Sequence, residues 1–213
     1  MSDTKLRERF GRLWRKLGAE DGEGLADELI RAYAEPHRRY HGLDHLRDCL
    51  AQLDAAPAEE TERDLAETAL WFHDAVFIPG GADNEARSAD WAADAMLRAG
   101  ISEVRAREVA RLVRSTDHAR PAADSMEALV CDVDLSILGR EPAEFAEYER
   151  RIRDEYRGVP EPLYRHGRSA VLSHFLARHP IYRSDHFRAR YESAARRNLI
   201  QALERLGSAP PPA

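Results

Sequence analysis

Two pairs of polar side chains interrupt apolar stretches in the first half of the sequence. The run YHGLDHL places His41 and His45 four residues apart, and the run LWFHDAVF places His73 beside Asp74. On a helix, residues four apart share a face, so the first two imidazoles can reach one site. A carboxylate buried beside the apolar residues that precede Asp74 would be costly without a cation partner or a metal ion.

A third polar group lies in the run CDVDLSILG, where Asp132 and Asp134 stand among aliphatic residues. A helix with one solvent-facing aspartate would explain one of these carboxylates, but less easily both. The sequence then has the order H…HD…D over three predicted helices. Two imidazoles and two carboxylates suit a divalent transition metal or magnesium. The order therefore predicts a metal site built from segments that are far apart in the chain.

The elements that must position these groups are helices. The apolar residues from Leu6 to Leu17 recur with helical spacing, and no stretch has a convincing period of two. A helix starting near Tyr40 would carry both histidines of the first pair and Cys49, a small core residue, on one stripe. Further helices are predicted over about residues 25–34, 65–74, 84–99, 102–116, 124–138, 142–157, 161–178 and 185–206.

Length and composition favour one compact all-α domain over residues 1–207, with a disordered tail at 208–213. The net charge of −6 argues against general affinity for nucleic acid. No apolar run approaches the ~20 residues that a membrane helix needs. The two cysteines form no CxxC pair and no disulfide framework. These features predict a cytoplasmic protein with no membrane partner.

The ordered set resembles the HD-domain superfamily of metal-dependent phosphohydrolases. The matching residues are His45, His73-Asp74 and Asp134. The element YHGLDH also looks like the Y-H-N-x-x-H element of cyclic nucleotide phosphodiesterases, with glycine in place of asparagine. Over residues 5–206 the pattern is similar to a bacterial family of predicted HD-superfamily phosphohydrolases. The resemblance implies an all-helical HD fold with a metal cleft between helices.

The same resemblance implies an activity and a ligand set. The activity is hydrolysis of a phosphate ester, in a nucleotide or a related small molecule, by a metal-activated water. The implied ligands of one divalent ion (Mn, Fe, Co, Ni, Zn or Mg) are His45, His73, Asp74 and Asp134, with Asp132 as the alternative to the last. Asp74 would also take or orient the proton of the water. His41 matches the general acid of the phosphodiesterases.

Three further residues are candidates beside this set. Arg38 is the preferred arginine for neutralising phosphate charge, ahead of others that include Arg168. Glu85 follows a glycine-containing loop, either as a first-turn helix residue or as a catalytic group that reaches the metal water or a ligand histidine. His118 is predicted to contact substrate or to support the ligands. No histidine lies between His118 and Asp134 to complete a second metal site.

Two other functions fit the same motifs. The chain could be a regulatory HD module that binds a nucleotide or metal without turnover. It could also be an HD-type di-iron oxygenase, although the missing histidine argues against that class. A homodimer is compatible with each of these functions, and the sequence does not name the substrate.

Overall fold

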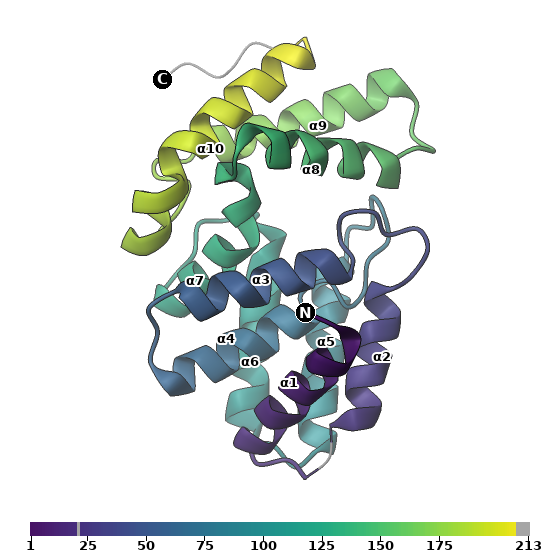
Figure 1. Cartoon of the computed structure of the whole chain (residues 1–213), viewed down its shortest axis with the longest axis vertical. Coiled ribbons are helices and arrows are strands. Elements are labelled where there is room, and N and C mark those ends of the chain that lie inside the picture. The colour runs from purple at the N-terminus through teal and green to yellow at the C-terminus, as the bar shows by residue number, and fades with distance from the viewer. Residues whose placement is uncertain (21, 208–213) are drawn as a thin grey trace. The chain divides into compact units, whose positions relative to one another are not determined.

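Figure 1 shows the computed structural model of the chain, which describes residues 1–20 and 22–207. Every regular element within these residues is a helix, so the predicted all-α fold is confirmed. None of the helices in this part of the chain is long and apolar enough to cross a membrane. The tail predicted to be disordered, 208–213, lies outside the described residues.

The helices follow one another with short connections. Their bounds are α1 Asp3–Lys16, α2 Glu23–Tyr33, α3 Leu43–Ala55, α4 Glu60–Phe72, α5 Asn84–Arg98, α6 Glu103–Arg114, α7 Ser125–Asp134, α8 Pro142–Glu155, α9 Glu161–Leu176 and α10 Asp185–Arg205, with short 3-10 helices η1 Ser115–Asp117 and η2 Leu135–Gly139. The chain divides into two compact units, Met1–Cys131 and the part from Asp132 onward. The boundary falls inside α7. The single domain predicted over 1–207 stays a prediction.

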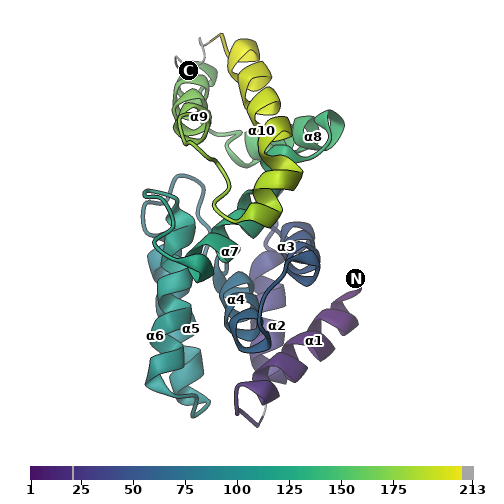
Figure 2. The ribbon, with the colours of Figure 1, turned by 90° about the vertical axis from the view of Figure 1, so that its left-hand side faces the viewer.

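Helix α4 is the central helix of the first unit. All residues from Ala66 to Phe72 are buried, which is the pattern of a helix surrounded by other helices. It contacts α1, α3, α5 and α6, while α5 and α6 run side by side (Figure 2). The rings of Phe10 in α1 and Trp71 in α4 meet edge to face at 5.0 Å between centroids. The C-terminal end of α4 is therefore held in the interior, together with His73.

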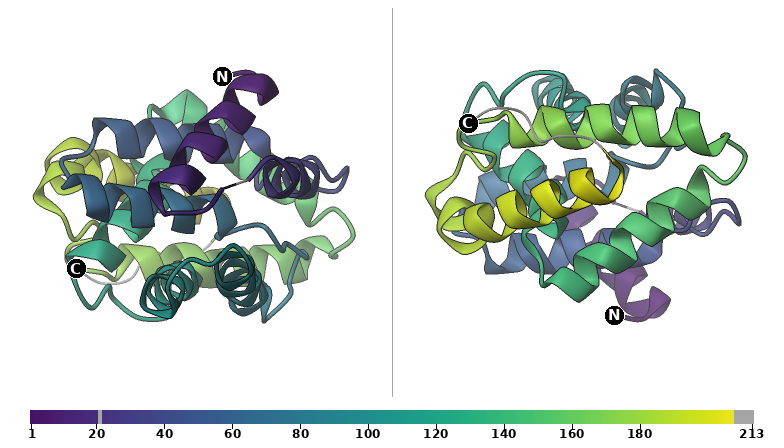
Figure 3. Two further views of the ribbon diagram at one scale, coloured as in Figure 1. Left: turned by 90° about the horizontal axis from the view of Figure 1, so that it is seen from below. Right: turned by 90° about the horizontal axis from the view of Figure 1, so that it is seen from above.

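The second unit is built from η2, α8, α9 and α10. Helix α10 packs against both η2 and α9, and the right-hand view of Figure 3 shows α9 and α10 from above. A Cβ atom at Gly139, at the end of η2, would collide with Tyr191 of α10, so glycine permits this close approach. Asn198 of α10 donates from Nδ2 to the carbonyl oxygens of Leu138 and Arg140, both at 2.9 Å. These bonds hold η2 against α10.

One helix boundary differs from the prediction in a way that matters for function. The helix expected to start near Tyr40 starts at Leu43, so His41 lies in the turn before α3 rather than on its stripe. The physical reason is that the carbonyl oxygen of His41 accepts a hydrogen bond from Arg38 Nη1, at 3.0 Å, outside any helix. His45 and Cys49 do lie on the buried face of α3, as predicted.

Candidate metal site

Three side chains of the first unit converge where α4 ends. His45 comes from α3, His73 is the C-cap of α4, and Asp74 follows it. The two histidine Nε2 atoms are 3.0 Å apart. Asp74 Oδ2 is 3.1 Å from Nε2 of His73 and 3.5 Å from Nε2 of His45. Two ligands ~2.1 Å from one ion and at right angles to each other are about 3 Å apart, so this spacing fits a metal site.

The tautomer of His73 is fixed by the end of its own helix. Its Nδ1 atom is 2.8 Å from the carbonyl oxygen of Leu70, which can only accept a hydrogen bond. Carbonyl groups in the last turn of a helix lack partners within the helix, so Leu70 is available for this bond. Nδ1 therefore carries the proton, and Nε2 presents its lone pair toward His45 and Asp74.

The Asp74 carboxylate has an unsatisfied oxygen. Its Oδ2 atom is buried and makes no hydrogen bond within the described part of the chain. Burial acts to raise the pKa of Asp74, but the imidazoles of His73, His41 and His45, when protonated, outweigh burial and lower that pKa below the ordinary range. A buried, ionised oxygen without a hydrogen-bond donor is the kind of atom that a cation satisfies. The residues present therefore fit a metal ion.

Cys49 belongs to the same buried cluster, although sequence reasoning assigned it to the core. Its Sγ atom is 3.6 Å from Nε2 of His45. The ligand atoms of His45, Cys49 and His73 all lie within 4.8 Å of one another, so this cluster could hold a metal ion. The sequence signal was the spacing of four residues between His45 and Cys49, which puts both on one face of α3.

Arg38 holds the backbone on both sides of this cluster. Its side chain is only 1% exposed. Nη1 donates to the carbonyl oxygens of His41 at 3.0 Å and Asp74 at 2.5 Å, and Nη2 donates to that of Ala75 at 3.0 Å. Nε donates to the carboxylate of Glu35 at 3.0 Å. This geometry makes Arg38 a positioning residue, and its predicted contact with substrate stays a prediction.

The loop after Asp74 is also fixed by side chains of α5. Ser88 Oγ accepts a hydrogen bond from the amide of Val76 at 3.0 Å. Asn84 accepts from the amide of Ile78 at 3.0 Å and donates to its carbonyl oxygen at 2.9 Å. The loop that carries Asp74 is therefore pinned on two sides, by Arg38 and by α5.

Other predicted site residues of the first unit lie around this loop. The His41 ring stacks on Phe77, with 4.3 Å between centroids, and its centroid is 6.0 Å from that of His45. Glu85 lies in the first turn of α5; burial raises its pKa, and the charge of Asp74 acts in the same direction. His118 is a buried residue with a left-handed backbone after η1, and its charge also acts on Glu85.

The two aspartates of α7 belong to the second unit and differ in their surroundings. Asp132 is 1% exposed, and its two oxygens accept hydrogen bonds from the amides of Arg183 at 3.0 Å and Ser184 at 2.7 Å. Asp134 is the last residue of α7 and is half-buried. Both oxygens of Asp132 are therefore used in backbone hydrogen bonds within the second unit, which argues against Asp132 as a metal ligand.

Comparison with protein-family models, curated proteins and solved structures finds no match to this chain. The resemblance to the HD-domain superfamily therefore depends on the sequence motifs alone and stays a prediction. Independently of that resemblance, the first unit holds a buried cluster of two imidazoles and a thiol that could bind a metal ion, with the Asp74 carboxylate beside the imidazoles.

Proposed function

We propose that this protein is a metal-dependent phosphohydrolase that cleaves a phosphate ester of a nucleotide or a related small molecule. The observation that supports it best is the convergence of His45 Nε2, His73 Nε2 and the unsatisfied Asp74 Oδ2 within 3.5 Å of one another. Asp134 is the proposed fourth ligand. A divalent ion held by these residues would supply a Lewis acid for a phosphate oxygen and would lower the pKa of a water.

The chain's own residues would orient the substrate and move protons. His41 is the group that we assign to protonate the leaving oxygen, because its ring lies beside the ligand set without belonging to it. Asp74 would accept or orient the proton of the attacking water. Glu85 and His118, whose charges interact, would orient that water and contact the phosphate. Arg38 would keep the His41 and Asp74 backbones in place.

The first experiment measures the metal content of purified protein by elemental analysis. We expect about one divalent ion per chain in the wild type and its loss in His73→Ala and in Asp74→Ala. His166→Ala is the matched control, because this histidine is exposed on α9 and should leave the metal content unchanged. Full metal content in both site variants, or none in the wild type after supplementation, would contradict the metal site.

The second experiment measures phosphate release by the metal-loaded protein from nucleoside monophosphates, cyclic nucleotides and small phosphate esters. We expect turnover of at least one class, with kcat about 10²–10⁴-fold lower in His41→Ala while the metal content stays the same. Metal binding without release from any of these classes would overturn the hydrolase proposal and favour a regulatory binding module.

A further inference from the structure

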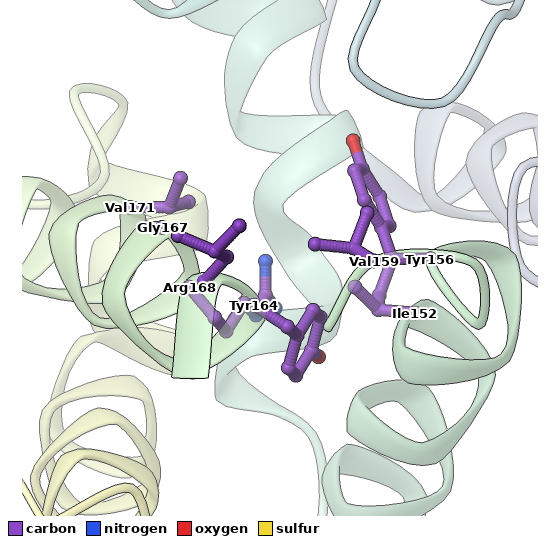
Figure 4. A pocket seen from close by; sticks show the side chains of 8 residues that line it. Ile152, Tyr156, Val159, Tyr164, Gly167, Arg168 and Val171 are labelled. Atoms are coloured by element: carbon purple, nitrogen blue, oxygen red, sulfur yellow. The ribbon is translucent and has the colours of Figure 1, made fainter. Parts of the chain in front are cut away.

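A cavity of about 290 Å³ lies in the second unit, between the end of α8, the following loop and α9 (Figure 4). Most side chains around it are apolar or aromatic, and they include Ile152, Tyr156, Val159, Leu163, Tyr164 and Val171. Ligand pockets typically enclose ~300–1,000 Å³, so the volume of this cavity is just below the lower limit of that range. None of its lining residues belongs to the proposed metal site.

A glycine in the middle of helix α9 forms part of the cavity wall. Leu163, Gly167 and Val171 are four residues apart and share one face of α9. Glycine within a helix is destabilising by roughly 0.5–1 kcal/mol relative to alanine. No atom lies within 4 Å of a Cβ built on Gly167, so this glycine avoids no clash. Because glycine has no side chain, space stays open between two large apolar residues, Leu163 and Val171. Their side chains are 64% and 43% exposed.

The walls of the cavity are fixed by bonds within the second unit. Arg153 donates from Nη1 to the carbonyl oxygen of Tyr156 at 2.6 Å and from Nη2 to that of Val159 at 3.3 Å. Its Nε atom also donates to Glu161 at 3.1 Å, so the loop between α8 and α9 is tied at both ends. Burial raises the pKa of Tyr164 to about 12, so this wall residue is uncharged at neutral pH.

One charged side chain, that of Arg168, lines the cavity, and a carboxylate already balances its charge. Arg168 is 9% exposed, and Figure 4 shows its guanidinium between the apolar side chains. Nε and Nη2 donate to the carboxylate of Glu149, and Nη2 also donates to the hydroxyl of Tyr148 at 2.7 Å. Nη1 makes no hydrogen bond with the residues that the structure describes. Nη1 of Arg168 is therefore a hydrogen-bond donor that a ligand can use, and it lies beside an ion pair, Arg168 with Glu149, that has no net charge.

We propose that this cavity binds a small, uncharged aromatic molecule that carries one hydrogen-bond acceptor, such as a carbonyl oxygen. The acceptor would bind Nη1 of Arg168, and the ring would lie between Tyr156, Tyr164 and the aliphatic side chains of α9. An anionic ligand fits less well, because the carboxylate of Glu149 already neutralises the guanidinium and would repel a second negative charge. A purely apolar ligand would cover this donor and leave it without a partner.

The test is a titration of the full chain, followed by the backbone amide signals of α9 in NMR spectra. The probes are three molecules of nearly equal shape: acetophenone, α-methylstyrene, which replaces the carbonyl oxygen by a methylene group, and benzoate, which is charged. We expect acetophenone to bind with a Kd on the order of 1 mM. It should bind about tenfold more tightly than α-methylstyrene, the effect of one hydrogen bond, and more tightly than benzoate.

A pair of variants at Gly167 provides the matched control. Gly167→Leu fills the cavity and should abolish the acetophenone shifts, whereas Gly167→Ala should retain them. Both changes replace a glycine inside a helix, so both proteins should fold. Unchanged acetophenone binding in Gly167→Leu, or tighter binding of benzoate, would overturn the proposal. Shifts of the same amides with protein concentration alone would also overturn it, in favour of a second copy of this chain at the cavity.

Discussion

The two aspartates of the CDVDL run can be distinguished, because the carboxylate of Asp132 already binds two backbone amides. Asp132 accepts two backbone hydrogen bonds at the start of α10, so its replacement should affect stability. We expect Asp132→Asn to lower the free energy of unfolding by about 1–3 kcal/mol, because an amide presents a donor to one of these N–H groups. We expect the variant to keep its metal. Asp134→Asn should lose its metal, but its free energy of unfolding should equal that of the wild type when both proteins are metal-free.

Urea denaturation and elemental analysis of the two variants, beside the wild type, check this prediction. If folded Asp132→Asn loses its metal while Asp134→Asn keeps it, the proposed fourth ligand is the wrong aspartate. The sequence alone does not show which of the two aspartates is the metal ligand, because each stands among aliphatic residues. The bonds from Arg183 and Ser184, some fifty residues later in the chain, distinguish them.

At the scale of elements, Arg38 joins the turn before α3 to the loop after α4. We expect Arg38→Lys to weaken metal binding by about 10–100-fold, the usual effect of losing a residue that orients ligands. A lysine retains the charge but cannot make the four bonds of the guanidinium to Glu35, His41, Asp74 and Ala75. Calorimetric titration of the metal-free protein with Zn²⁺ measures this change.

Arg39→Lys is the control, because Arg39 is the exposed neighbour of Arg38. The affinity of Arg39→Lys for Zn²⁺ should equal that of the wild type. An unchanged Zn²⁺ affinity in Arg38→Lys would show that the loop keeps its position without the guanidinium. Circular dichroism melting of both variants ensures that the comparison is made between folded proteins.

A second feature at the scale of elements is a buried carboxylate, that of Glu127, which fixes the start of α7. Glu127 is fully buried, and its carboxylate accepts hydrogen bonds from Arg120 at 2.7 and 2.8 Å, from Arg111 at 2.6 Å and from the amide of Ala123 at 2.7 Å. The bonds from Arg120, with those from Ala123 and Arg111, outweigh burial and lower the pKa of Glu127 to about 2.

A lowered pKa means that the folded state favours the ionised carboxylate. This contribution to stability is complete above the ordinary pKa of about 4.5 and is lost as the pH falls toward about 2. We expect Glu127→Gln to be less stable than the wild type by roughly 2–4 kcal/mol at pH 7, and by much less near pH 2. Urea unfolding at several pH values tests this, and a constant difference between the two proteins would contradict it.

Most helices could be predicted from the sequence because their ends carry local signals. Gly100 follows α5 with a positive φ, and Pro142 begins α8 at the first helical position. The start of α3 could not be predicted, because the bond from Arg38 to the carbonyl oxygen of His41 depends on how the chain folds back. The sequence alone predicts that His45 and Cys49 lie side by side, because this depends only on their spacing. It does not predict the tautomer of His73.

At the scale of the whole molecule, no sequence signal marks the residue at which the first unit ends and the second begins. Helical periodicity continues through α7, and no glycine, proline or charged run marks the boundary after Cys131. The buried contacts divide instead by which helices they reach: Cys131 Sγ donates to the carbonyl oxygen of Ser115 in the first unit, whereas Asp132 binds backbone amides of the second. A single helix can serve two cores when adjacent residues point to different sides.

Metal binding should be measurable in the stability of the whole chain. An ion that binds only the folded state stabilises it by ~4 kcal/mol when its free concentration is 1,000 times Kd. For a chain of this size each kcal/mol corresponds to a change of roughly 2–4 °C in the melting midpoint. Removing the metal with EDTA should therefore lower the melting midpoint of the wild type by roughly 8–16 °C.

Scanning calorimetry of His73→Ala should show a low midpoint that EDTA does not change. His166→Ala should respond as the wild type does, since its histidine lies outside the cluster. An equal EDTA shift in His73→Ala would mean that the chelator removes an ion from somewhere other than the cluster at the end of α4.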